Sequence, residues 1–301
     1  MSEYDKEACE KFKLSGKILR EAREEIKGFV REGMMIIDIC EKAEGLIKKK
    51  GARPAFPCNV SINEVAAHYT SPPNDKRRVP ENSVVKVDIG AHVDGYVTDT
   101  AVTVCFNRDY EDLVGTAERA LQVAVESIKP GTSASKLGAL IERTIKSRGF
   151  KPISNLSGHQ VGRYMVHTGT SIPNVSQLSL TKIKLGGVYA IEPFVTLSDA
   201  AGRVEDGDES TIFRFVKSRS LENSYAKQLL KFIEENFRTL PFAERWLKGV
   251  VPKEHQGEAL NALLASKALM HYPVFVEASR KTVAQAEHTV MIVEDGCVVL
   301  T

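Results

Sequence analysis

Apolar residues at three- and four-residue spacing predict four amphipathic helices in the first half of the chain. We expect them over residues 15–30, 34–50, about 111–128 and 135–148, with Gly51 ending the second helix. Residues 51–82 contain five prolines, which predict irregular backbone. Two strands are then expected, at 84–89 and 96–105, and a short turn at 92–95 would join them as a hairpin.

In the second half, strand-like runs lie on both sides of a long stretch with helical spacing. Strands are predicted at 187–195, 272–277 and 284–299, with a return through Gly202, and helices from about 218 to 269. This order of elements predicts an α+β fold with helices inserted between two strands of one sheet. We therefore expect one catalytic domain made of residues 1–195 and 272–301, and an inserted helical subdomain at 196–271.

Composition narrows the class of protein. Lys and Arg number 41 against 39 Asp and Glu, a net charge of +2, so binding to DNA by phosphate neutralisation is not expected. The acidic start is not a signal peptide, and no run approaches the roughly 18 apolar residues that span a bilayer. Five scattered cysteines without C-x-x-C spacing predict neither a disulfide framework nor a zinc knuckle. The protein is thus expected to be cytoplasmic and without membrane contact; a monomer is a separate expectation.

Acidic residues interrupt the two strands of the predicted hairpin. Asp88 lies in an otherwise apolar strand, and Asp99 shares a strand face with Val97 and Ala101. The hairpin would let the two carboxylates converge on one face. Burying ionised carboxylates side by side is costly unless a positive charge lies between them. A metal site is one interpretation; the alternative is that each carboxylate pairs with a buried arginine or caps a turn.

The same intrusion occurs at two later strands. Glu192 and Glu287 lie in strand patterns otherwise fit for a core, and His159 lies among glycines that allow close approach of the backbone. Two Asp, two Glu and one His supply mostly oxygen ligands, which suits two divalent transition ions better than a structural zinc. Such a pair of ions can activate water and polarise a carbonyl.

Asp88, Asp99, His159, Glu192 and Glu287, in this order, resemble the five metal ligands of the methionine aminopeptidase and prolidase superfamily, which has the pita-bread fold. Segments 55–57, 61–68, 155–159, 189–192 and 285–289 are similar to type 2 methionine aminopeptidases, and 235–240 distinguishes type 2 from type 1. The resemblance covers essentially the whole chain and is strongest to archaeal members. It implies a pseudo-twofold pair of αβ halves around an antiparallel sheet, with a helical, winged-helix-like insertion that need not bind DNA.

The resemblance also implies roles for the ligands. Asp88 would hold one metal ion, Asp99 and Glu287 would bridge two, and His159 and Glu192 would complete the other shell. Glu192 would also help to move a proton, and Glu287 is the alternative residue for that role. The ions could be Co, Mn, Fe or Zn, because all four tolerate this ligand set.

Five further residues match the family's substrate site. His68 would contact the scissile amide nitrogen or the leaving group, and His167 would hydrogen-bond the carbonyl oxygen as charge develops. The pocket for the methionine side chain would be lined by Phe56, Val166 and Tyr272.

The implied activity is removal of the N-terminal methionine from nascent polypeptides whose second residue is small and uncharged. A transient contact with the ribosome is also expected. One alternative is an Xaa-Pro dipeptidase, although those enzymes usually carry a large domain before the first metal ligand and only 87 residues precede Asp88. The other is a catalytically inactive binding homologue, although all five ligand positions hold competent residues.

Overall fold

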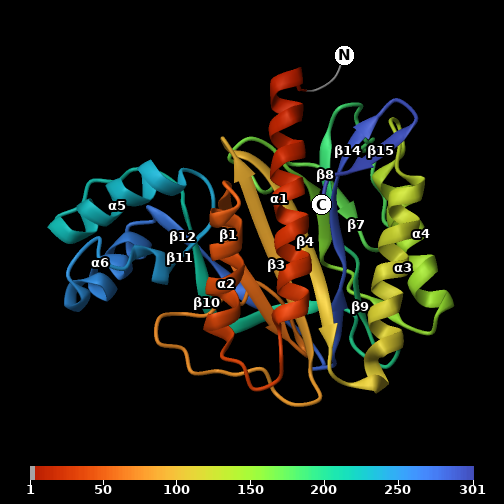
Figure 1. The fold of residues 1–301 in the computed structure, drawn as a ribbon, viewed down its shortest axis with the longest axis horizontal. Helices are drawn as coiled ribbons and strands as arrows, with labels where there is room; N and C mark the ends of the chain where they lie inside the picture. Colours follow the sequence, from red (N-terminus) through yellow and green to blue (C-terminus); the bar gives the residue numbers. More distant parts are fainter. Residues whose placement is uncertain (1–3) are drawn as a thin grey trace.

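A computed structural model describes residues 4–301 (Figure 1). The four helices expected in the first half are present as α1 (Lys6–Phe29), α2 (Ile36–Lys49), α3 (Glu111–Ser127) and α4 (Ala134–Ser147). Helix α1 is longer than predicted and begins at Lys6 rather than at residue 15. Asp5 caps it by accepting a hydrogen bond from the Ala8 amide at 2.8 Å, and Phe12 extends its buried face by another turn.

The helices pack on an eight-stranded antiparallel sheet. Its main path runs through β1 (Arg53–Ile62), β3 (Val84–Val93), β4 (Tyr96–Cys105), β14 (Glu287–Val293), β8 (Val188–Ile191), β6 (Ser157–Gln160) and β7 (Ser171–Pro173), and β15 (Gly296–Val299) pairs with β14. Strands β3 and β4 are the predicted hairpin, and they continue beyond residue 89 to a tight turn at Asp94-Gly95. Both turn residues have positive φ, as such turns require.

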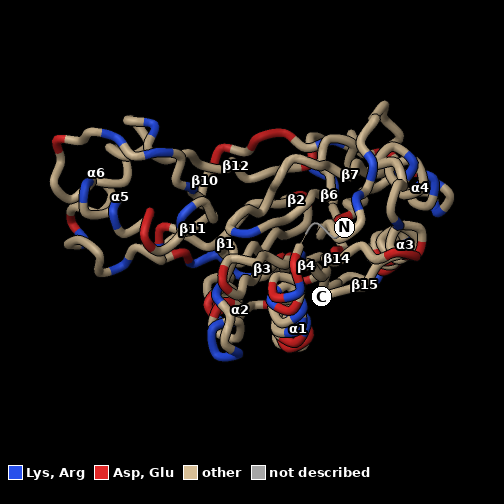
Figure 2. Tube along the Cα trace, turned by 90° about the horizontal axis from the view of Figure 1, so that it is seen from above, with Lys and Arg blue, Asp and Glu red and all other residues tan. Residues whose placement is uncertain are grey.

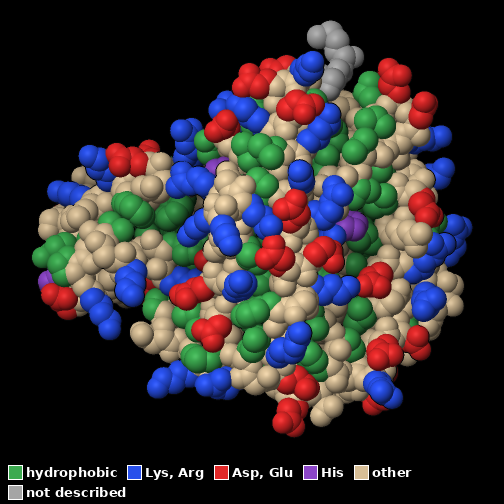
Figure 3. All heavy atoms as spheres, viewed as in Figure 1, with side chains coloured by type: hydrophobic (Ala, Val, Ile, Leu, Met, Phe, Trp, Pro, Cys, Tyr) green, Lys and Arg blue, Asp and Glu red, His purple; other side chains and the backbone are tan. Residues whose placement is uncertain are grey.

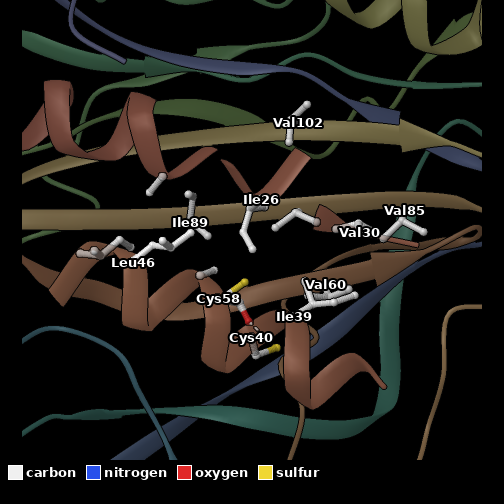
Figure 4. Close-up of a cluster of buried hydrophobic side chains, with 14 of the residues drawn as sticks. Ile26, Val30, Ile39, Cys40, Leu46, Cys58, Val60, Val85, Ile89 and Val102 are labelled. Carbon is white, nitrogen blue, oxygen red and sulfur yellow. Dashed lines mark hydrogen bonds between the residues drawn. The ribbon is translucent and has the colours of Figure 1, made fainter. Parts of the chain in front are cut away.

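Two hydrophobic cores give the molecule two αβ halves, as the pita-bread resemblance implies. Helices α1 and α2 pack on β1 and β3, and Figure 4 shows Ile26, Ile39, Val60 and Ile89 meeting in that core. Helices α3 and α4 pack on the half that contains β8 and β14. Seen from above, α1 and α2 lie on one side of β3 and β4 (Figure 2). The opposite face of the sheet is therefore left for the site.

The proline-rich segment 51–82 is more regular than predicted. It contains β1 and β2 (Val65–Ala67), and β1 includes Pro54 and Pro57. Strand β1 tolerates them because it lies at the edge of the sheet and because its register with β3 shifts on both sides of Phe56. The prediction of irregular backbone was therefore wrong for residues 53–67 and is confirmed for residues 68–82, which contain Pro72, Pro73 and Pro80.

The predicted strand 187–195 is also corrected. It divides into β8, which ends at Ile191, and β9 (Phe194–Thr196), which belongs to a three-stranded sheet with β5 (Lys151–Pro152) and β13 (Val283–Gln285). Pro193 at the division cannot donate a ladder hydrogen bond. Glu192 therefore lies where the chain crosses from one sheet to another, not inside a strand.

The segment expected to be helical from 218 to 269 contains two helices, α5 (Ser224–Phe237) and α6 (Lys253–Ala265), with a hydrophobic core of their own. Between them lie β11 (Phe242–Ala243) and the short 3-10 helix η2 (Glu244–Leu247), and Leu269 already begins β12 (Leu269–Glu277). A four-stranded sheet, β11-β10-β12-β2, with β10 at Val204–Phe215, joins these helices to the main body. The domain limits at 196 and 271 stay a prediction, and residues 1–3 of the first predicted domain lie outside the described residues.

Three global features bear on the class of protein. No helix within residues 4–301 is both long enough and apolar enough to cross a membrane. On the face shown in Figure 3, lysine and arginine side chains are interspersed with aspartate and glutamate. The five cysteines, at 9, 40, 58, 105 and 297, are free thiols.

Candidate active site

The β3–β4 hairpin brings the first two acidic residues to one face of the sheet. In its register Asp88 pairs with Ala101, and Asp99 pairs with Gly90. Because side chains alternate along a strand, Asp88 and Gly90 point to the same side, so the two carboxylates are diagonal neighbours. Phe56 packs directly over Gly90, where a Cβ would lie only 2.2 Å from its ring. The hairpin thus places an apolar wall beside a pair of acids.

Strands β14, β8 and β6 bring the other three ligand candidates to the same place. Glu287 at the start of β14 pairs with Ala101, and His159 in β6 pairs with Ala190 in β8. The Nε2 atom of His159 lies 3.6 Å from Asp99 Oδ2 and 3.4 Å from Glu192 Oε1. The ligand atoms of Asp99, His159 and Glu287 all lie within 4.8 Å of one another. Asp88 and Glu192 stand outside this tightest group.

The glycine before His159 makes this approach possible. A Cβ at Gly158 would lie 2.4 Å from the carbonyl oxygen of Ala190. Only a residue without a side chain allows β6 and β8 to come this close. The prediction that the glycine permits close backbone approach beside His159 is confirmed.

The four carboxylates are held in an environment that disfavours their charge. Burial raises the pKa of Asp88 to about 6. Burial, and then repulsion from neighbouring carboxylates, raise the pKa values of Asp99, Glu192 and Glu287 well above the usual range. Within residues 4–301, His159 is the one basic side chain with a nitrogen within 4.0 Å of any of the four carboxylates, and burial lowers its pKa well below the ordinary value, so it supplies no positive charge.

The donor set therefore fits divalent cations. Asp88 Oδ1, Asp99 Oδ1 and Glu287 Oε1 are buried and have no hydrogen-bond partner within the described part of the chain. Buried polar atoms without partners are unusual unless a ligand or ion satisfies them. Carboxylate oxygens with one imidazole nitrogen suit hard or borderline divalent ions. The alternative of two buried arginines has no support among these contacts.

Neighbouring polar side chains fix the carboxylates, and these neighbours were missed from the sequence. Asn59 Nδ2 donates to Asp88 Oδ2 at 3.3 Å, and Gln285 Nε2 donates to Glu287 Oε2 at 3.3 Å. The Thr289 hydroxyl accepts from the Asp99 amide at 2.8 Å and donates to the Asp99 carbonyl at 2.7 Å. Asn59 is itself a polar residue in a buried strand, a signal hidden by the prolines around it.

The two candidate histidines border the carboxylates. His68 follows β2 with φ +66°, a left-handed conformation rare outside glycine. Its ring centroid lies 4.5 Å from that of Phe275 and 5.6 Å from that of Tyr272. Burial and the charge of His167 lower the pKa of His68 to about 4, so its imidazole is neutral near pH 7. The His167 ring, more exposed, lies 4.1 Å from that of His159 between centroids.

A single cavity of about 290 Å³ contains every residue singled out from the sequence. These are Phe56, His68, Asp88, Asp99, His159, Val166, His167, Glu192, Tyr272 and Glu287. Apolar walls are completed by Ile212, Phe275 and Pro241, of which Ile212 and Pro241 come from the predicted insertion. The cavity thus combines an acidic floor with apolar walls, the arrangement expected where a charged reaction centre adjoins a side-chain pocket.

Comparisons with known proteins agree with this arrangement. The model of metallopeptidase family M24 matches residues 10–227. The methionine aminopeptidase of Methanocaldococcus jannaschii is 43% identical over 98% of this chain and 99% of its own.

Two solved structures resemble this chain in fold, at a sequence identity too low to indicate more than the fold. A thermophilic Arx1 has a TM-score of 0.82 at 18% identity, covering 99% of this chain and 91% of that one. The methionine aminopeptidase of Thermotoga maritima has a TM-score of 0.72 at 23% identity, covering 99% and 98%. Taken with the near full-length sequence match, these findings show that the chain belongs to metallopeptidase family M24, among the methionine aminopeptidases.

Proposed function

We propose that this protein removes the N-terminal methionine from polypeptides whose second residue is small and uncharged, using two divalent metal ions. The observation that carries the proposal is the cluster of four carboxylates and one histidine on the floor of an apolar-walled cavity. The near full-length similarity to an enzyme named methionine aminopeptidase supports the choice of substrate.

Five residues would hold the metal ions: Asp88, Asp99, His159, Glu192 and Glu287. When bound, the ions supply Lewis acidity that polarises the peptide carbonyl and lowers the pKa of water. Their charge would also favour the ionised carboxylates, whose pKa values are raised by burial. The hydrogen bonds from Asn59 and Gln285 would keep one oxygen of Asp88 and of Glu287 in place.

The remaining roles are proton transfer and substrate placement. Glu192, at the crossing between two sheets, has a side chain that is 13% exposed and would take and return a proton, and Glu287 is the second candidate. Neutral His68, which lines the cavity, would contact the reacting amide nitrogen or the leaving group. His167, which also lines the cavity, would donate to the carbonyl oxygen.

The apolar walls would select methionine. Phe56, Val166 and Tyr272 face the cavity and present aromatic and branched surfaces to an unbranched thioether side chain. A narrow space beyond the scissile bond would exclude large second residues, so we expect discrimination of Met-Ala-Ser from Met-Lys-Ser.

Metal removal tests the proposal directly. Exhaustive chelation, checked by elemental analysis, should abolish cleavage of Met-Ala-Ser, and addition of Mn, Co, Fe or Zn should restore it. Met-Lys-Ser should remain uncleaved throughout. Full activity in metal-free protein would contradict the metal mechanism, and equal cleavage of both peptides would contradict the specificity.

The same assay separates the alternatives. Cleavage of Ala-Pro but not of Met-Ala-Ser would indicate an Xaa-Pro dipeptidase. A metal-loaded protein that cleaves neither peptide would indicate a binding homologue. A transient ribosome contact, a monomeric state and a cytoplasmic location stay predictions from the family resemblance.

A further inference from the structure

A buried ion pair joins the predicted insertion to the first half of the molecule. Arg245 in η2 contacts Glu44 in α2, and both side chains are less than a tenth exposed. Trp246 Nε1 donates to the other Glu44 oxygen at 2.8 Å, and the Cys58 amide donates to Glu44 Oε1 at 3.1 Å. Glu44 therefore connects α2, η2 and strand β1 at one point.

The other arm of the Arg245 guanidinium holds a second segment. Its Nη1 donates to Thr70 Oγ1 at 2.9 Å and to the Ser71 carbonyl at 3.0 Å. The Thr70 hydroxyl in turn donates to the Cys58 carbonyl at 2.7 Å. Figure 4 shows Cys58 of β1 near Cys40 of α2 in the hydrophobic core of this half. One planar side chain thus bridges Glu44 and residues 70–71 at the same time.

The segment held in this way leads directly from His68. Thr70 and Ser71 are fully buried and follow His68 by two and three residues. The Val60 amide donates to the Tyr69 carbonyl at 2.8 Å, which fixes the same segment to β1. His68 has a left-handed backbone, which persists only where the surroundings enforce it.

The His68 ring has one polar anchor of its own, a hydrogen bond with the Pro273 backbone. Its Nδ1 atom is buried and lacks a hydrogen-bond partner within the described residues. The ring is held by contacts with Phe275 and Tyr272 and by its own backbone. Since this single hydrogen bond leaves Nδ1 without a partner, the orientation of His68 also depends on where the backbone at 68–71 is placed.

We propose that Arg245 is a positioning residue for His68: by bridging Glu44 to residues 70–71, it holds the His68 backbone in its left-handed conformation beside the carboxylates. This inference rests on the proposed aminopeptidase activity, because it assigns a reason for the orientation of His68. It also gives the inserted segment a role in catalysis through a side chain that does not line the active-site cavity.

Arg245→Lys is the primary test. A lysine keeps the positive charge near Glu44, but its single ammonium cannot reproduce the planar fork that reaches both segments. Misplacing a reacting group by about 1 Å can cost roughly 100-fold in rate, so kcat on Met-Ala-Ser should fall roughly 10- to 100-fold. KM and metal content should stay near their wild-type values. Arg219→Lys, an exposed arginine in the same predicted insertion, is the matched control and should be unchanged.

A double variant separates positioning from general damage. In the His68→Ala background, Arg245→Lys should cause no further loss of kcat, because the group it positions is absent. Thr70→Val, which removes the Arg245 contact and the hydrogen bond to the Cys58 carbonyl but leaves the Glu44–Arg245 pair, is the second variant should Arg245→Lys fail to fold. An unchanged kcat in Arg245→Lys, or the same fold-loss with and without His68, would overturn the proposal.

A spectroscopic readout keeps the test independent of activity. The imidazole resonances of His68, assigned by their loss in His68→Ala, should shift in Arg245→Lys and not in Arg219→Lys. If the wild-type protein cleaves no methionyl peptide, the proposed function fails while this shift still tests the positioning role. Unshifted His68 resonances in a folded Arg245→Lys protein would refute it.

Discussion

Gly158→Ala tests whether the close approach of β6 and β8 builds the active site. An added Cβ would lie 2.4 Å from the Ala190 carbonyl oxygen and 3.3 Å from the Ile191 Cα. Nonbonded atoms of this kind rest at roughly 3.5 Å, so the strands would have to separate by about 1 Å. The opposing atoms belong to backbone, so no change of rotamer can relieve the contact.

The displacement falls on the ligand cluster itself. His159 follows Gly158, and Glu192 follows Ile191, so the strands that separate carry both partners of the 3.4 Å contact. Overpacking of this kind typically costs about 1–3 kcal/mol of unfolding free energy. A misplacement of about 1 Å costs roughly 100-fold in rate. Both losses are expected in Gly158→Ala, together with weaker metal binding.

Three measurements and one control decide the outcome. Urea unfolding gives the stability, elemental analysis the metal content, and Met-Ala-Ser cleavage gives kcat/KM. Gly45→Ala is the control, because it lies in α2 with no atom within 4 Å of the added Cβ. It should stabilise the protein by about 0.5–1 kcal/mol and leave catalysis unchanged. A Gly158→Ala protein with wild-type stability and rate would refute the reasoning.

Further predictions concern single side chains. Asp99→Ala should lose both metal and activity, whereas His68→Ala should keep its metal and lose roughly 10²–10⁴-fold in rate. Elemental analysis and kinetics on both variants check this. Loss of metal in both variants would mean that His68 is a ligand or a folding residue. Burial and the charge of Arg53 lower the pKa of His92 from 6.5 to about 4, and its Nδ1 accepts from the Gly95 amide. Because the folded protein holds His92 neutral while the unfolded chain binds a proton below pH 6.5, the free energy of unfolding should fall by about 3 kcal/mol as the pH falls from 6.5 toward 4. In urea unfolding, His92→Asn should flatten that pH dependence, and an equally steep loss would contradict the assignment.

The sequence singled out the residues of the proposed reaction centre because they violate the pattern around them. An aspartate in a run of valines is conspicuous to period-two counting, and so is a glutamate in Tyr189–Phe194. Helices α2 to α4 were predictable for the same kind of reason, since one apolar face determines each of them. Local patterns such as these depend only on which side of an element is buried.

What the tertiary structure decided is which elements meet. Strand β1 was hidden by its prolines, because its position at a sheet edge and its register shifts exist only once β3 lies beside it. The end of β8 at Ile191 reflects a change of sheet, which periodicity does not encode. Asn59 became part of the site through its pairing with Asp88. The contact of Arg245 with Glu44 joins residues 201 positions apart, and no local spacing carries that information. The pattern of side chains along an element indicates which of its faces is buried. Which element covers that face depends on contacts between residues that are far apart in the sequence.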